Sequence, residues 1–267
     1  MLLFRFKLII SLHGNEVERL RTLSKRSLKY YLYKKLFNAA VSITGCSKFL
    51  VTELQRNFNR INANKCFPMY NGVSEVCLTQ KLILHKSDYI FCAARFAPIK
   101  GLDLIIKAVD NNIIKKLLIA GGDQNDLLKL GIPINGSITL LGSLSHDEIA
   151  HYLSFSEVTV VPSRRETYGI LLAEAICCGS PVVATNVGGI PEVIAIATEK
   201  MSLNEKEIFN CWVKLVEPNS ESIRNGIDAL LNNNGSIEDY INLVPKFRNN
   251  YFWPTRLYKF HTILAEL

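Results

Sequence analysis

Short apolar runs alternate with amphipathic stretches from Asp88 onward. The apolar runs predict buried strands at residues 89–94, 116–120, 137–141, 157–161 and 181–185. Between them, apolar residues recur at helical spacing and predict helices at residues 101–110, 124–130, 146–154 and 170–178. Strands and helices that alternate at this length indicate an α/β fold in which helices cover both faces of a doubly wound parallel sheet.

The segment before Asp88 shows the same alternation in a shorter form. It predicts strands at residues 6–12, 41–44 and 65–69 and helical stretches at residues 16–37 and 47–58. Three further helices are expected near the end of the chain, at residues 219–232, 236–249 and 254–266.

These elements suggest four parts of the chain. We expect a partial N-terminal Rossmann-like domain (1–75), a linker (76–87), a complete C-terminal Rossmann-like domain (88–250) and a terminal helix (251–267) that packs back toward the N-terminal part. The dipeptide Asn71-Gly72 near the first boundary fits a simple tight turn equally well.

Positive charge is concentrated in the first third of the chain. The net charge is +7, and residues 1–85 hold fourteen Lys and Arg against four Asp and Glu. Such an excess indicates an anionic partner, either a lipid surface or a nucleic acid. No nucleic-acid recognition motif accompanies the charge, so we expect no nucleic-acid partner.

Residues 21–37 carry six cations and no acid, with leucines and tyrosines between them. This stretch could rest on an anionic membrane. Its apolar residues do not form one clean helical stripe, so a merely solvated basic face remains an alternative.

The cysteines and the apolar runs indicate in which cellular compartment we expect the protein. The seven cysteines form no C-x-x-C pair, which favours reduced thiols in a cytoplasmic protein. Arg5 and Lys7 interrupt the first apolar run, so we do not expect a signal peptide. No apolar run approaches the roughly 18 residues that a membrane span needs.

Ligands of doubly wound sheets bind beyond the carboxyl ends of the strands, so the loops there are the candidate site. In the loop after the strand at 89–94, Arg95 and Lys100 lie beside a predicted helix start. Two cations at this place repel each other and are disfavoured by the helix dipole, which costs stability. A bound anion such as a phosphate would offset this cost. Two solvated surface cations are the alternative.

The loop at residues 162–169 contains Glu166, and Glu174 lies in the helix that follows. Ser163 and Glu166 have the spacing of a helix capping box, but Gly169 would then fall inside the first turns of the helix. We therefore expect the helix to begin near Gly169 and Glu166 to stay on the loop. With one acid on a loop and one in a helix, the pair is not placed to flank a glycosidic bond, and each is better suited to accept ligand hydroxyl groups.

Taken together, these segments resemble glycosyltransferase family 4, whose members have the GT-B fold. The resemblance rests on "SLHG" (11–14), "YNGV" (70–73), "ARFAPIKGLDLIIKA" (94–108) and above all "ETYGILLAEAICCGSPVVATNVGGIPEVI" (166–194). The last segment matches the family's E-x7-E signature. The resemblance implies a retaining transferase that takes a sugar from a nucleotide-diphosphate donor and needs neither a bound metal nor another cofactor.

The resemblance also assigns roles to residues on the donor side. Arg95 and Lys100 would hold the donor diphosphate, and Glu174 would accept the ribose hydroxyls. The backbone at Gly169, Ile170 and Leu171 would lie near the diphosphate and the sugar, and the backbone near Leu144 would contact the base.

Two residues are implied in catalysis. Glu166 would face the donor sugar, and His13 would lie against the transferred sugar. The acceptor would be a glycan or a lipid-linked molecule of polysaccharide or lipopolysaccharide biosynthesis, which suits a protein bound peripherally to the inner face of the membrane.

We expect the first strands of the family's N-terminal domain to have no counterpart in this sequence, since only residues 1–75 precede the expected linker. Two interpretations follow. The chain could be a hexosyltransferase, or a donor-binding half that cannot transfer sugar without a missing part or a partner chain. An epimerase or phosphorylase of the same fold is a third alternative.

Overall fold

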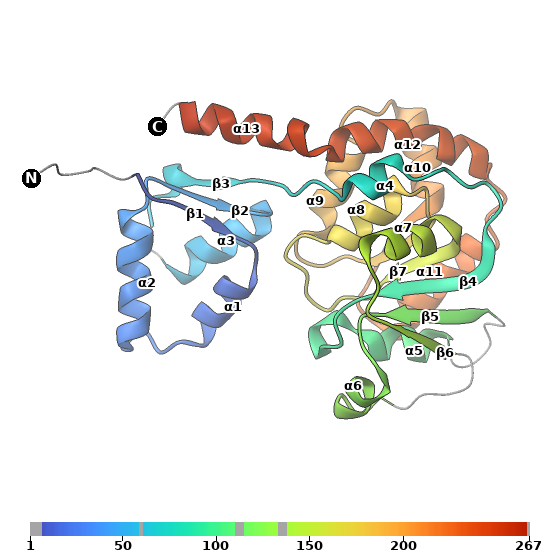
Figure 1. Ribbon diagram of the computed structural model, residues 1–267, viewed down its shortest axis with the longest axis horizontal. Helices are drawn as coiled ribbons and strands as arrows, with labels where there is room; N and C mark the ends of the chain where they lie inside the picture. Colours follow the sequence, from blue (N-terminus) through green and yellow to red (C-terminus); the bar gives the residue numbers. More distant parts are fainter. Residues whose placement is uncertain (1–6, 59–60, 110–114, 133–137, 266–267) are drawn as a thin grey trace, which may run out of the picture. The chain divides into compact units, whose positions relative to one another are not determined.

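The computed structural model describes residues 7–58, 61–109, 115–132 and 138–265, and its contacts divide the chain into two compact units. The first unit comprises the residues up to Asn71 together with those from Pro254 onward, and the second is Gly72–Trp253. Both units contain parallel sheets with helices (Figure 1). The predicted α/β class is therefore confirmed.

The first unit contains a parallel sheet with the strand order β1-β2-β3. Its elements in chain order are β1 (Ile9–Leu12), α1 (Asn15–Thr22), α2 (Leu28–Ala39), β2 (Ser42–Gly45), α3 (Lys48–Asn57), the short 3₁₀ helix η1 (Ala63–Lys65), β3 (Cys66–Pro68) and α13 (Trp253–Ala265), which begins at the boundary. The first strand was expected from residue 6, and that residue lies outside the described part of the chain.

The single helical stretch expected at 16–37 is wrong, because the structure breaks it in two. Helix α1 ends at Thr22, and α2 begins only at Leu28. The Ser27 side chain accepts a hydrogen bond from the Tyr30 backbone N–H (3.1 Å) and so starts a new helix. Helix α2 therefore has its own set of buried and exposed positions, separate from those of α1.

The second unit contains the larger sheet. Its elements in chain order are α4 (Glu75–Thr79), β4 (Ser87–Ala93), the 3₁₀ helix η2 (Pro98–Lys100), α5 (Leu102–Val109), β5 (Lys116–Ala120), α6 (Gln124–Lys129), β6 (Ile138–Gly142), α7 (His146–Phe155), β7 (Ser156–Val161), α8 (Ile170–Cys177), β8 (Val182–Thr185), α9 (Ile190–Ala197), α10 (Leu203–Trp212), β9 (Val213–Val216), α11 (Ser220–Leu231) and α12 (Ile237–Tyr251).

The six strands of this sheet are all parallel and follow the order β6-β5-β4-β7-β8-β9. The chain builds the sheet outward from β4 to β6, then returns to place β7 on the other side of β4. The predicted doubly wound topology is therefore confirmed. In this topology the loops after β4 and β7 leave neighbouring strands in opposite directions, which opens a crevice between them.

Helices cover both faces of the larger sheet (Figure 1). On one face α5 and α11 pack against each other, and α11 contacts β7, β8 and β9. On the other face α7 and α8 contact β7, and α12 packs on α8. The core beneath α5 and α11 is made of fully buried aliphatic side chains, which include Ile90, Ile105, Leu117, Val160 and Ile227. This core holds the carboxyl ends of β4 and β7 in fixed register.

The segment expected to be a linker (76–87) belongs to the second unit. Its first residues, 76–79, lie in helix α4, which contacts α7 and α8, and the Cys77 side chain is only 1% exposed. The Lys86 ammonium donates to the carbonyl oxygens of Ser154 (2.8 Å) and Gly179 (2.9 Å), near the ends of α7 and α8. The polar composition suggested a linker because it did not reveal these buried contacts.

The region between residues 186 and 218 contains more structure than the sequence patterns predicted. Helices α9 and α10 were missed, and β9 adds a parallel strand beside β8. The signal for α10 was present, because Ser202 and Glu205 form a complete capping box at its start.

Gly72 lies where the chain passes from the first unit to the second. It does not form the tight turn considered as an alternative, since residues 71–74 form no turn in the structure. Instead, a Cβ atom here would lie 2.8 Å from the ring of Trp253 and from the Tyr251 carbonyl oxygen. The backbone N–H of Val73 also donates to that carbonyl (3.2 Å). Glycine is required at this position by close packing.

Candidate functional site

A cavity of about 200 Å³ opens at the carboxyl ends of β4 and β7. It is lined by Ala93, Ala94, Arg95, Lys100, Val161, Pro162, Ser163, Glu166, Gly169, Ile170 and Leu171. All of these residues lie at the ends of the two strands, in the loops that follow them, or in the first turn of α8. The cavity therefore occupies the crevice that the topology predicts.

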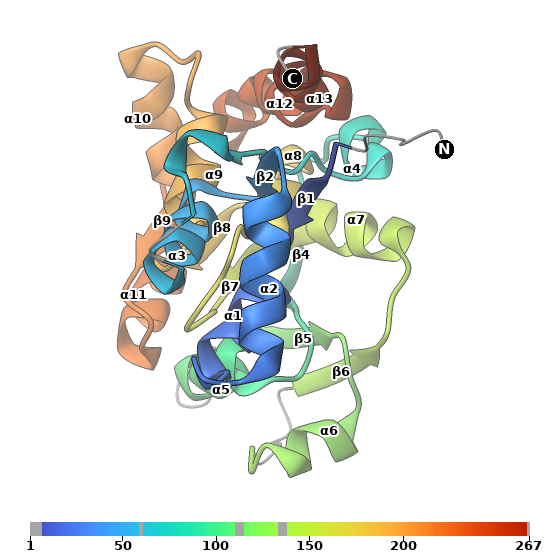
Figure 2. The same ribbon diagram turned by 90° about the vertical axis from the view of Figure 1, so that its left-hand side faces the viewer.

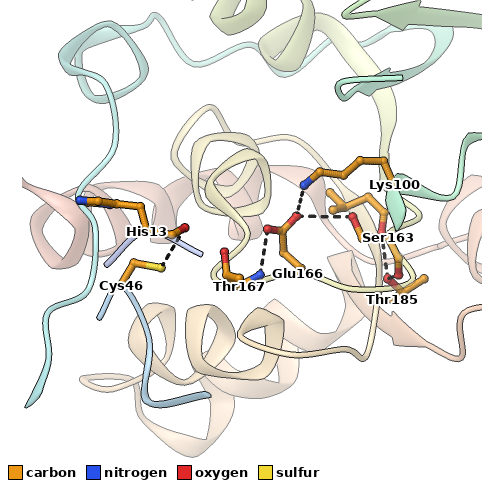
Figure 3. Close-up of polar contacts among 8 residues, drawn as sticks. His13, Cys46, Lys100, Ser163, Glu166, Thr167 and Thr185 are labelled. Carbon is orange, nitrogen blue, oxygen red and sulfur yellow. Dashed lines mark hydrogen bonds and ion pairs between the residues drawn. The ribbon is translucent and has the colours of Figure 1, made fainter. Parts of the chain in front are cut away.

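Glu166 and Lys100 form an ion pair inside this cavity, with 2.5 Å between Lys100 Nζ and Glu166 Oε2 (Figure 3). Both side chains are largely buried, at 18% exposed for Lys100 and 14% for Glu166. The Ser163 hydroxyl (3.4 Å) and the Thr167 backbone N–H (3.1 Å) donate to the same carboxylate. Glu166 lies on the loop, as predicted, but its pairing with Lys100 was not predicted.

Arg95 is exposed at the mouth of the cavity, directly after β4. Within the described residues its guanidinium has no hydrogen bond or ion pair. Because an arginine is always charged and offers a planar fork of donors, an unpaired guanidinium at a cavity is suited to bind phosphate or carboxylate oxygens.

The N-terminus of α8 forms one wall of the cavity. Gly169 precedes the helix with φ at 104°, and no side chain caps the first turn. The backbone N–H groups of that turn are therefore left for a ligand, together with the positive end of the helix dipole. The helix begins at Ile170, so the capping-box alternative for Ser163 and Glu166 is wrong.

Glu174 lies farther along α8 and does not line the cavity. Its side chain is 7% exposed, and it makes no hydrogen bond within the described part of the chain. Burial raises the pKa of its carboxyl group to about 7. A hydrogen bond with Cys178 and burial raise the pKa of the nearby Cys77 thiol, and burial raises the pKa of the Cys177 thiol; the Glu174 charge adds only a smaller effect to each.

The two remaining predicted residues lie elsewhere. Leu144 is in the loop after β6, which is two strands away from β4 and three from β7, and it does not line the cavity. His13 belongs to the first unit, where it follows β1. Its ring Nε2 lies 3.4 Å from the Ser11 hydroxyl, and its carbonyl oxygen accepts from the Cys46 thiol at 3.9 Å.

Contacts between the β4–α5 and β7–α8 loops were missed by the sequence patterns. The Arg164 guanidinium donates to both carboxylate oxygens of Asp103, each at 2.6 Å. Gly101 has φ at 66°, and a Cβ atom there would lie 2.0 Å from the Pro162 carbonyl oxygen. A local pattern could not reveal these contacts, since the partners are about sixty residues apart in sequence.

Neither a metal site nor a membrane-spanning helix is present in the described part of the chain. No group of three or more His, Cys, Asp and Glu side chains is arranged to hold a metal ion within that part of the chain. Among the described helices, none is both long and apolar enough to cross a membrane.

Residues 78–247 match the family model described as glycosyl transferases group 1, and they contain the whole cavity. The chain belongs to this family. A glycosyltransferase of Methanocaldococcus jannaschii named as uncharacterized is 30% identical over 191 residues, which cover 70% of this chain and 51% of that protein. The N-acetyl-α-D-glucosaminyl L-malate synthase of Bacillus anthracis is 27% identical, over 71% of this chain and 52% of that enzyme. The chain thus spans about half the length of these two relatives.

Solved structures of glycosyltransferases share the fold. Anabaena HepE in complex with UDP and glucose has a TM-score of 0.70 at 19% identity, covering 98% of this chain and 72% of HepE. Sucrose-phosphate synthase from Thermosynechococcus elongatus has a TM-score of 0.69 at 20% identity, covering 99% of this chain and 68% of that enzyme. The predicted GT-B fold class is therefore confirmed.

Proposed function

We propose that the cavity between the β4–α5 and β7–α8 loops binds the diphosphate of a nucleotide-sugar donor, and that the chain acts in retaining sugar transfer. One observation carries the proposal: the unpaired Arg95 guanidinium lies with Lys100 at a cavity walled by the uncapped N-terminus of α8. Arg95 and the N-terminus of α8 supply positive potential at one small cavity, and Lys100 adds a third cation for a ligand that draws it away from Glu166. This arrangement favours a ligand with more than one negative charge.

In this proposal the protein's own groups stabilise the leaving diphosphate. Arg95, Lys100 and the first N–H groups of α8 take up the charge that develops as the glycosidic bond to the donor breaks. No metal or other cofactor is assigned a role. Glu166, held at the cavity wall, orients the donor sugar, and Glu174 accepts the ribose hydroxyls.

The finer identity of the reaction is also part of the proposal. The names of the relatives point to a hexose or N-acetylhexosamine donor, since HepE was solved with UDP and glucose and the Bacillus protein is named N-acetyl-α-D-glucosaminyl L-malate synthase. WaaG, a further protein with the same fold (TM-score 0.63, 14% identity), is described as acting in lipopolysaccharide biosynthesis. We propose a family 4 hexosyltransferase with a glycan or lipid-linked acceptor.

Calorimetric titration with UDP, ADP, GDP and their glucose conjugates tests donor binding. We expect one nucleoside diphosphate to bind, and we expect Arg95→Gln to weaken it at least tenfold, because this guanidinium has no competing partner within the described residues. Lys246→Gln removes the cation of the Lys246–Glu205 ion pair, which joins α12 to α10 in the same unit, and serves as the matched control. If all six ligands fail to bind, or if Arg95→Gln binds like the wild type, the proposal is wrong.

The alternative is a donor-binding half that cannot transfer sugar alone. It is favoured by the chain's coverage of only about half of the two relatives above. The purified chain, incubated with the donor that it binds and a panel of lipid and glycan acceptors, distinguishes the two. Turnover that depends on acceptor supports the complete enzyme. Tight donor binding without turnover supports the half, and epimerised donor without acceptor supports the third alternative.

We also propose that helix α2 rests on an anionic membrane, which would place a cytoplasmic protein on the inner face. Four apolar side chains of α2 are exposed at helical spacing: Leu28 (72%), Tyr31 (52%), Leu32 (55%) and Leu36 (44%). Figure 2 shows this helix along its length. The stripe was hidden in the sequence because Tyr30 and Phe37 pack inward against Phe58.

Vesicle flotation tests the membrane proposal. The protein is expected to float with vesicles that contain phosphatidylglycerol, and Leu32→Glu is expected to abolish flotation by placing a charge in the exposed stripe. Leu203→Glu, which alters an 82% exposed leucine of the second unit, is the control. Equal flotation with purely zwitterionic vesicles, or of Leu32→Glu, would exclude an electrostatic membrane face on α2.

A further inference from the structure

We propose that Arg164 and Asp103 form a positioning pair that holds the β4–α5 loop, and with it Lys100, in place against the β7–α8 loop. This inference rests on the proposed donor site and deepens it. Neither residue lines the cavity, so neither is a catalytic residue.

The pair joins the two loops in a fixed geometry. Arg164 Nη1 and Nη2 donate to the two carboxylate oxygens of Asp103, both at 2.6 Å, and Nη1 also donates to the Pro98 carbonyl oxygen (3.0 Å). A bidentate contact of this kind fixes the orientation of both side chains, unlike a contact through one nitrogen. Asp103 lies in the first turn of α5, where the helix dipole also favours a negative charge.

Backbone contacts bring the loops together at the same point. The N–H groups of Arg164 (2.8 Å) and Arg165 (3.3 Å) both donate to the Ile99 carbonyl oxygen. The acceptors at Pro98 and Ile99 belong to η2, whose last residue is Lys100. The pair therefore acts one or two residues away from the cation that the donor diphosphate would bind.

The β7–α8 loop is itself anchored from the other side. The Thr185 hydroxyl at the end of β8 donates to the Ser163 carbonyl oxygen (2.5 Å), and the Gly189 N–H donates to the Glu166 carbonyl oxygen (3.1 Å). Figure 3 shows the first of these contacts beside the Lys100–Glu166 pair. The loop of Glu166 is thus anchored to the end of β8 and the start of α9. The loop of Lys100 contacts the loop of Glu166 through Arg164 and through the Lys100–Glu166 ion pair.

Donor binding would affect the Lys100–Glu166 ion pair but not the Arg164–Asp103 pair. A diphosphate that draws Lys100 away from Glu166 removes the ion pair between the loops. Within the described contacts, the Arg164–Asp103 pair is then the side-chain link that remains between the loops. Its loss would let Lys100 drift relative to Arg95 and to the first turn of α8, and a displacement of about 1 Å is enough to reduce activity strongly.

A role of Arg164 through its charge and a role through its position predict opposite effects of Asp103→Asn on UDP binding. If Arg164 acted only by its positive charge, Asp103→Asn would strengthen the binding of an anion and Arg164→Gln would weaken it. If the pair acts by position, both variants weaken UDP binding and lower kcat/KM, by about tenfold each. Arg164→Lys separates the two ideas again, because it keeps the charge but loses the bidentate fork, and we expect it to weaken UDP binding as well.

The experiment compares the wild type, these three variants and two matched controls, by UDP titration and by amide hydrogen exchange of the ligand-free protein. The controls, Lys246→Gln and Glu205→Gln, break an ion pair of the same unit with similar exposure (48% and 21%, against 41% for Arg164 and 28% for Asp103). We expect weaker UDP binding and faster exchange at residues 95–101 in the three variants, and neither change in the controls.

Three outcomes would overturn the positioning role: stronger UDP binding by Asp103→Asn, wild-type binding by Arg164→Lys, or unchanged exchange at residues 95–101. If the wild type itself binds no UDP, ADP or GDP, the proposed donor function fails, and the exchange measurement alone decides the pair. Faster exchange in the variants would then still support it, and unchanged exchange would reject it.

Discussion

Replacing Glu174 with glutamine is expected to stabilise the second unit at pH 8 and to weaken nucleotide binding at the same pH. The carboxyl group is 7% exposed and has no hydrogen-bond partner within the described residues. Burial without a partner disfavours the charged form, which is why its pKa is raised from 4.5 to about 7. Glutamine has nearly the same shape and carries no charge at any pH.

The sign and size of the effect follow from this shift. Between pH 4.5 and 7 the folded protein keeps a proton on Glu174 that the unfolded chain has released. The stability that this proton contributes is fully present below pH 4.5 and is lost as the pH rises through 7. Glu174→Gln should therefore match the wild type near pH 4. Above pH 7 it should be more stable, by on the order of 3 kcal/mol for a shift of this size.

Urea unfolding followed by tryptophan fluorescence measures this difference in the relevant unit, because both tryptophans, Trp212 and Trp253, belong to it. The free energies of unfolding of wild type and variant are compared at pH values from 5 to 8. A difference that does not change with pH, or a variant that is less stable at pH 8, would refute the argument from burial. Calorimetry at pH 8 with the nucleotide that the wild type binds should show weaker binding by the variant. Unchanged affinity would remove Glu174 from the donor site.

Three further predictions concern other residues. Gly101→Ala should destabilise the second unit by about 2 kcal/mol or more, because it combines a left-handed φ with a clash at 2.0 Å against Pro162; Gly131→Ala, with a similar φ of 69° and nothing within 4 Å, should cost less in the same unfolding assay. Of the seven cysteines only Cys211 is exposed, so a thiol reagent should label one residue quickly in the native protein and all seven after denaturation; several fast equivalents would contradict the burial. His13→Ala should lower the turnover of an active preparation without changing its affinity for UDP, and a pure loss of affinity would argue against its predicted catalytic role.

The strands of the larger sheet could be predicted closely because each is a short apolar run with a clear end. The prediction of residues 116–120 matches β5 at both ends, and the prediction of residues 157–161 misses only the first residue of β7. The helix prediction failed where a serine starts a helix that the spacing of apolar residues did not reveal. Ser27 separates α1 from α2, and Ser202 starts α10 in a region that was assigned no helix. Both serines are N-caps, whose role depends on a hydrogen bond from the backbone that follows.

The loop position of Glu166 could also be predicted, because Gly169 in the first turn of a helix would be unfavourable. Its partner could not. Lys100 and Glu166 meet only because β7 returns to lie beside β4 after the chain has built β5 and β6. The strand order is decided by the packing of the whole sheet, and no local pattern at either residue encodes it. The same holds for Arg164 and Asp103, whose partly exposed side chains would look like solvated charges in the sequence alone.

The Lys100–Glu166 pair changes how the proposed donor site would work. The sequence suggested that two free cations await a diphosphate, but Lys100 is already neutralised by Glu166 in this structure. An incoming diphosphate therefore meets Arg95 and the first turn of α8 before it competes for Lys100. Once Lys100 turns to the phosphate, the Glu166 carboxylate keeps the Ser163 hydroxyl and the Thr167 N–H as donors and gains a free side for a sugar hydroxyl. Diphosphate binding and sugar binding are then coupled through a single ion pair, so UDP alone, without a sugar to occupy Glu166, should bind less tightly than its sugar conjugate.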